Sequence, residues 1–170
     1  DKIISIDDKI DILNNRIKEY LTKIAQNPLN QEDARKQMSY MYIIGNIEHI
    51  GDIIHKEMIG LANKLIGRNL NFHPQDLQKL EEYHKFLADA YSKLFNGFKV
   101  DDIEAINSVP ENKINLIKME NEIKKLHFSL LAQNCKDATA TTSIFLDVLN
   151  CFHSIYSHLS AISYIIRGEF

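Results

Sequence analysis

Two carboxylates and a histidine in one stretch of the sequence have the types and spacing that could bind a metal ion. Glu48 and Asp52 stand four residues apart, and His55 follows three residues later. On a helix this spacing places the three side chains on one side, at the edge of the row of apolar residues that would pack against neighbouring helices. Carboxylate oxygens with an imidazole suit Zn, Fe or Mn. The sequence therefore leaves two interpretations open: a divalent or iron-type metal at Glu48 and Asp52, with His55 as an additional candidate, or a solvated face in which a lysine of a neighbouring helix pairs with these charges.

Three further groups of polar residues could also do chemistry. His153, Ser157 and His158 crowd one late segment, where we expect polar packing or contact with a partner helix rather than metal ligation. Glu81 and His84 have the Glu-x-x-His spacing of di-iron bundles, but such sites need a second copy of the motif and two further glutamates. We therefore predict a non-enzymatic protein without catalytic residues, and we keep a di-metal, ferritin-like enzyme as the alternative hypothesis. Lysines and glutamates interleaved over residues 111–125 predict an exposed, salt-bridged face, namely Lys113, Lys118, Lys124 and Lys125 with Glu111, Glu120 and Glu122.

The composition narrows the classes of protein that fit. A chain of 170 residues with 45% hydrophobic residues, 6 Gly and 3 Pro predicts one helical domain over residues 1–170. A net charge of −3 gives no basic footprint for nucleic acid, which we exclude as a partner. Cys135 and Cys151 have no paired spacing, which favours reduced thiols in the cytoplasm. No apolar run approaches the roughly 20 residues of a membrane helix, so we expect a soluble chain.

Apolar residues recur at alternating spacings of three and four in five segments, a pattern typical of long, nearly parallel packed helices. The first runs from Ile3 to Ile24 and ends before Asn27-Pro28. The second is predicted to open with a capping box at Asn30 and Asp33 and to end near Arg68. The remaining three are a helix from Pro74 to Asn96-Gly97, a helix opened by a capping box at Ser108 and Glu111 after an acidic link over 101–107, and a helix that follows a polar stretch over 133–142.

The second and fifth helices repeat one pattern. A shift of 105 residues places Ile47 on Phe152 and Ile50 on Ile155. The first and fourth helices behave in the same way, since a shift of 106 residues places Leu13 on Met119. Two helices repeating at nearly one offset predict an internal duplication. We therefore predict an all-α antiparallel bundle of two repeats, three helices over about 1–97 and two over about 101–170, with the sixth helix absent.

The pattern resembles the PhoU-like family of helical bundles. Residues 46–52, Asn-Ile-Glu-His-Ile-Gly-Asp, are similar to the glutamate-basic-isoleucine-glycine-aspartate signature of that family. Residues 95–105 are similar to its join between repeats. Within the family, the last helix resembles the C-terminal cytoplasmic domain of bacterial sodium/phosphate cotransporter-related proteins, on Leu-Asp-Val-Leu-Asn at 146–150 and Ser157-His158.

The resemblance implies a regulator of phosphate uptake rather than an enzyme. In the PhoU-like family the acidic pairs can bind metal clusters. The resemblance implies this role only for Glu48 and Asp52, because His153 and Ser157 occupy the matching positions of the second repeat. The first copy also departs from the signature at Ile53, where histidine is common. The resemblance further implies a location at the inner face of the membrane, with a transporter domain in the same chain.

The absent sixth helix has a predicted consequence. The second repeat would expose the apolar side of its last helix, which favours self-association or a protein partner. The contact is expected through four residues of that helix: Phe152, Ile155, Leu159 and Ile162.

Overall fold

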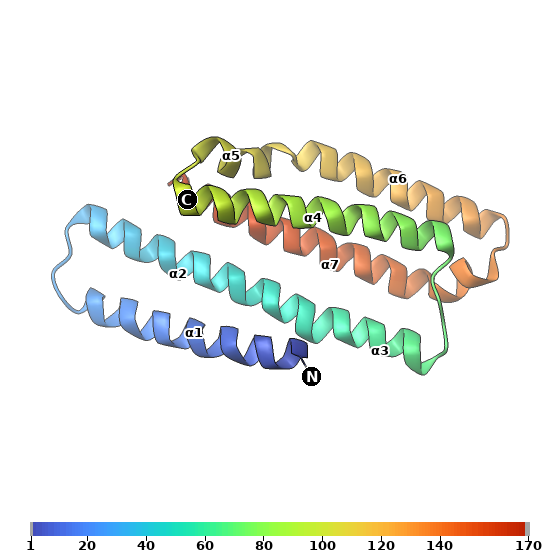
Figure 1. Cartoon of the computed structure of the whole chain (residues 1–170), viewed down its shortest axis with the longest axis horizontal. Coiled ribbons are helices and arrows are strands. Elements are labelled where there is room, and N and C mark those ends of the chain that lie inside the picture. Colours follow the sequence, from blue (N-terminus) through green and yellow to red (C-terminus); the bar gives the residue numbers. More distant parts are fainter. Residues whose placement is uncertain (1, 169–170) are drawn as a thin grey trace.

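A computed structural model describes residues 2–168 and shows an all-α bundle of long helices (Figure 1). The predicted fold class is confirmed, with no strand in the part of the chain that the structure describes. The elements in chain order are α1 (Lys2–Ala25), α2 (Gln31–Asp52), the π-helical turn η1 (Ile53–Met58), α3 (Ile59–Gly67), α4 (Pro74–Val100), α5 (Ile103–Glu111), α6 (Lys113–Ala132) and α7 (Lys136–Ile166).

The second and third long helices begin where the sequence predicts. Asn30 caps α2, because its side-chain oxygen accepts a hydrogen bond from the Asp33 backbone N–H at 2.8 Å. The Asn30 side-chain amide also donates to the Asp33 carboxylate. Pro74 occupies the first turn of α4, where its missing N–H costs nothing. α2, η1 and α3 follow one another as one long rod.

The fourth helix begins earlier than predicted, so the capping box at Ser108 is wrong. α4 continues past Asn96-Gly97 to Val100, Asp101 takes a left-handed conformation, and Asp102 caps α5 by accepting from the Ala105 N–H at 3.0 Å. The first two residues of the acidic link are therefore helix caps, and the rest of it is helical. Ser108 lies inside α5, where its hydroxyl bonds to the Ala105 carbonyl.

Pro110 marks the break between α5 and α6, and α7 compensates for it. A proline has no N–H to give to the carbonyl four residues back, which here is Ile106. The Ser163 hydroxyl of α7 donates to that buried carbonyl at 2.7 Å, and the Tyr156 hydroxyl of α7 donates to the Val109 carbonyl. The break therefore also fastens α5 to α7.

The last helix is longer than predicted, because the polar stretch over 133–142 is largely helical. Thr141 and Thr142 donate their hydroxyls to the carbonyls of Asp137 and Ala138, which allows a threonine to sit inside a helix. The described residues include both cysteines, and both are free thiols.

α7 is the centre of the bundle, contrary to the expectation of an exposed face. It contacts every other element except α1, and all four residues predicted to meet a partner are 9% exposed or less. The expected exposure of Phe152, Ile155, Leu159 and Ile162 is therefore wrong. The reason is that α4 packs on α5, α6 and α7, although the sequence assigned this helix to the first repeat, and so covers the side of α7 that was expected to be open.

The open position lies instead beside the first repeat. Within residues 2–168, α1 contacts only α2 and η1, and it lies at the edge of the bundle (Figure 1). Its buried positions are Asp7, Asn14 and Leu21, whereas the predicted seam is largely in solvent. The seam predicted for α1 therefore identified a real apolar stripe but the wrong packing face.

Gly97 brings α4 and α5 together, and we expect Gly97→Ala to lower the free energy of unfolding by about 1–2 kcal/mol. A Cβ there would lie 3.0 Å from both the Asp102 carbonyl oxygen and the Ile106 side chain. Gly60 on α3 is the matched control, because nothing lies within 4 Å of its Cβ position and alanine there should stabilise by about 0.5–1 kcal/mol. Urea unfolding of both variants measures the difference, and equal effects would contradict the packing at Gly97.

Candidate functional site

The two predicted metal ligands lie on α2, and each meets a lysine. Lys18 of α1 lies 3.7 Å from Glu48, and Lys56 lies 2.7 Å from Asp52, one turn along the same rod. This pairing is the second of the two interpretations that the sequence left open. Both carboxylates are part-exposed, so each ion pair contributes little to stability.

His55 is turned toward α1 rather than toward the predicted pair. Its Nδ1 lies 2.5 Å from the Asp7 carboxylate, which is almost fully buried. A Cβ at Gly51 would lie 3.3 Å from the other Asp7 oxygen and 3.8 Å from Ile10. The glycine of the signature therefore makes room for the carboxylate that holds His55.

The polar groups around η1 form a small charged cluster between α1 and the rod. Asp7, Asp52, His55 and Lys56 belong to it. The hydrogen bond to Asp52 is the largest cause that raises the pKa of Lys56, and the charges of Asp52, Asp11 and Asp7 raise it further. A π-helical turn is uncommon and is often found at functional sites. No group of three or more His, Cys, Asp or Glu side chains within residues 2–168 is arranged to hold a metal ion.

The second repeat places a histidine contact at the position of the first repeat's ion pair. His153, which matches Glu48, lies with its Nδ1 2.8 Å from Glu120 of α6. The same Glu120 oxygen accepts from the Tyr83 hydroxyl of α4 at 2.5 Å. Burial first, and then the Glu120 carboxylate, raises the pKa of Tyr83, so the hydroxyl keeps its proton and remains a donor. Three helices thus meet at one carboxylate.

The remaining predicted histidine, His158, joins the two repeats. Its Nδ1 contacts the Asn46 side-chain oxygen at 2.8 Å, and its ring lies 5.3 Å from that of His49. Burial, followed by the nearby His49, lowers the pKa of His158 and favours the neutral ring. Ser157 donates to the His153 carbonyl within α7. The polar-packing role predicted for this segment is therefore confirmed for His153 and His158.

A buried pair that the sequence did not suggest lies at the start of α4. His127 Nδ1 is 2.9 Å from the Asp76 carboxylate and its Nε2 is 3.2 Å from the Thr142 hydroxyl, while the ring stacks on Phe145 at 4.3 Å. His127 and Asp76 are both fully buried. Asp76 lies in the first turn of its helix, where the backbone dipole favours a negative charge.

Spacing could have revealed these residues. Glu120 and His127 recur at threes and fours with Leu116, Ile123 and Leu130, and all five are buried. Glu120 is therefore not part of an exposed, salt-bridged face as predicted. Glu81 and His84, the predicted fragment of a di-iron motif, are both exposed on α4.

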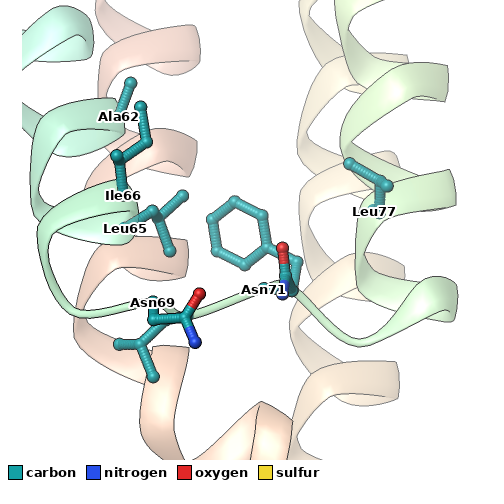
Figure 2. A pocket seen from close by; sticks show the side chains of 8 residues that line it. Ala62, Leu65, Ile66, Asn69, Asn71 and Leu77 are labelled. Atoms are coloured by element: carbon teal, nitrogen blue, oxygen red, sulfur yellow. The ribbon is translucent and has the colours of Figure 1, made fainter.

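A pocket of about 460 Å³ lies where α3 leads into α4. Figure 2 shows Ala62, Leu65 and Ile66 on α3 and Leu77 across from them on α4, with Asn69 and Asn71 on the connecting loop. Apolar side chains and two amides offer no acid, base or nucleophile. The pocket suits an apolar group rather than a reaction.

Comparison with known proteins supports the PhoU resemblance. Residues 1–56 match the model of the PhoU domain. Curated relatives named "Putative inorganic phosphate export protein YjbB" from Escherichia coli (strain K12), Shigella flexneri and Salmonella typhimurium are each 20% identical over 162 residues. The match covers 95% of this chain and 30% of each relative, so the chain spans less than a third of their length. No solved structure gives a significant match.

Proposed function

We propose that this PhoU-like chain is a non-enzymatic regulatory module of phosphate transport, the cytoplasmic portion of a sodium/phosphate cotransporter-type protein. The observation that carries the proposal is the match of nearly the whole chain to part of the phosphate export relatives. A piece that forms only 30% of such a relative is suited to control transport carried out by the rest. None of the helices in residues 2–168 has the length and apolarity needed to cross a membrane.

The polar contacts support a regulatory role over a catalytic one. Three of the histidines singled out in the sequence bridge helices, His55 to α1, His153 to α6 and His158 to α2. Contacts of this kind set how helices pack and can change that packing in response to a ligand or partner. The module would then act by presenting one of two packings to the transporter.

A divalent or iron-type metal at Glu48 and Asp52 remains a prediction, and the present arrangement does not fit it well. Lys18 and Lys56 would have to leave before the carboxylates could ligate a cation. Metal analysis of protein purified with added Zn²⁺ or Mn²⁺ tests this, with Glu48→Gln/Asp52→Asn as the comparison. Metal that is lost in this variant would support the site, and equal content in both proteins would remove it.

Phosphate flux tests the regulatory proposal. In cells that carry the intact gene product, removal of residues 2–168 should leave flux of radiolabelled phosphate but abolish its adjustment to the internal phosphate level. Gly60→Ala, whose added Cβ meets nothing, is the control that should behave as the wild type. Flux that adjusts normally without the module would contradict regulation, and turnover of a phosphate ester by the purified chain would contradict the non-enzymatic reading.

A further inference from the structure

α1 carries an apolar stripe that the rest of the described chain does not cover. The stripe consists of Ile3, Ile6, Leu13, Ile17 and Tyr20, whose exposed fractions run from 38% to 65%. Ile10, half-buried beside Gly51, lies within its length. Among the described residues α1 contacts only α2 and η1, and this helix lies at the edge of the bundle (Figure 1).

The spacing of the stripe is that of a helix-packing seam. Its residues alternate steps of three and four from Ile3 to Ile24, the heptad pattern that a second, nearly parallel helix fills. The contact with α2 uses a different set on a neighbouring face, namely Asp7, Asn14 and Leu21. α1 therefore has two packing faces, and α2 fills one of them.

A row of basic residues borders the stripe on the side away from α2. Lys2, Lys9, Arg16 and Lys23 recur every seven residues, each one position before an isoleucine of the predicted seam, namely Ile3, Ile10, Ile17 and Ile24. All four are exposed, and none forms an ion pair with another residue in the described range 2–168. In packed helix pairs this margin is where charges select the partner.

We propose that this face binds an amphipathic helix of a partner protein whose seam is apolar and whose facing margin is acidic. The apolar stripe supplies the contact area, and the basic row selects acidic residues and sets the register. The inference rests on the proposed function only in assuming that the module acts by binding a protein, and it holds whatever ion is transported.

Two other occupants fit the face less well. In an antiparallel pair of two copies the same margins meet, which sets Lys and Arg against Lys and Arg. In a parallel pair the basic row would face the line of Asp7, Asn14 and Leu21, which is already buried against α2. A strongly basic helix favours binding to an anionic membrane. α1 carries five basic and four acidic residues, so it lacks this property.

Binding of designed helical peptides tests the proposal. The probe is a fluorescent peptide of the length of α1, 24 residues, with leucines along its seam and glutamates along one margin. Its counterpart has lysines in place of the glutamates. We expect the acidic peptide to bind the intact chain about tenfold more tightly than the basic one, and Lys9→Glu/Arg16→Glu to reverse that order. Lys113→Glu/Lys125→Glu, on exposed positions of α6, is the matched control that should preserve it.

Exposed positions allow the stripe to be changed without loss of the fold. Leu13→Gln/Ile17→Gln should keep the thermal midpoint of the wild type and lose binding of the acidic peptide. Equal binding of the two peptides, or none by either, would overturn the proposal. A dimer seen by light scattering and abolished by Leu13→Gln/Ile17→Gln would also overturn it, because a second copy would then occupy the face. Binding to phosphatidylserine vesicles that is abolished by the same variant, without binding of either peptide, would overturn it in favour of a membrane.

Discussion

Asp76→Ala should lower the free energy of unfolding by about 3 kcal/mol, measured by urea denaturation. The substitution removes the carboxylate that lies 2.9 Å from His127 Nδ1 and leaves that ring nitrogen fully buried without its partner. It also opens a cavity between α4 and α6 and removes an acidic group from the first turn of α4. Each of these changes acts in the same direction.

Asp76→Asn is the control for this prediction. The asparagine oxygen can still accept from the histidine ring and fills nearly the same volume, so it should lose much less than the alanine variant. Gln75→Ala, at the exposed neighbouring position, should change stability by less than about 0.5 kcal/mol. Alanine and asparagine variants of equal stability would show that the Asp76–His127 contact does not support the fold.

Local signals in the sequence predict most of the helix boundaries. Asn30 with Asp33 and Pro74 act within one turn of their own helices, and the structure confirms both. The wrong boundary at Ser108 arises because Asp102, six residues earlier, caps the helix instead. Ser163 and Tyr156, which lie more than 40 positions further along the chain, also donate to carbonyls of α5, and such distant contacts cannot be predicted from local signals.

Tertiary topology explains what the sequence could not predict about the site. The stripe of α1 and the seam of α7 have the same periodicity, yet one is exposed and the other is the core. The difference arises because α4 packs against the second repeat, a choice that no pattern within α1 or α7 records. The partners of the candidate residues, Lys18 for Glu48 and Asp7 for His55, depend on that same arrangement.

Glu120→Ala should lower the free energy of unfolding by about 2 kcal/mol, because it removes the acceptor shared by two helices. The Tyr83 hydroxyl, in a side chain with no exposed surface, would lose its partner, and His153 would lose its contact with α6. Thermal unfolding followed by circular dichroism measures the loss. Glu122→Ala, at an exposed position of the same helix, should leave the unfolding transition almost unchanged.

A double variant separates the hydrogen bond from the packing around Glu120. Tyr83→Phe alone leaves the carboxylate with His153 as its contact and should cost about 1 kcal/mol, the typical value of one hydrogen bond. Tyr83→Phe/Glu120→Ala removes the buried donor and acceptor together, and we expect its cost to be smaller than the sum of the two single costs, since no polar group is then buried unpaired. Costs that simply add in the double variant would mean that the two side chains act independently. Recovery in the double variant would show that the carboxylate is held in place by Tyr83, so that helices α4, α6 and α7 are coupled through one polar contact that a change at His153 can perturb.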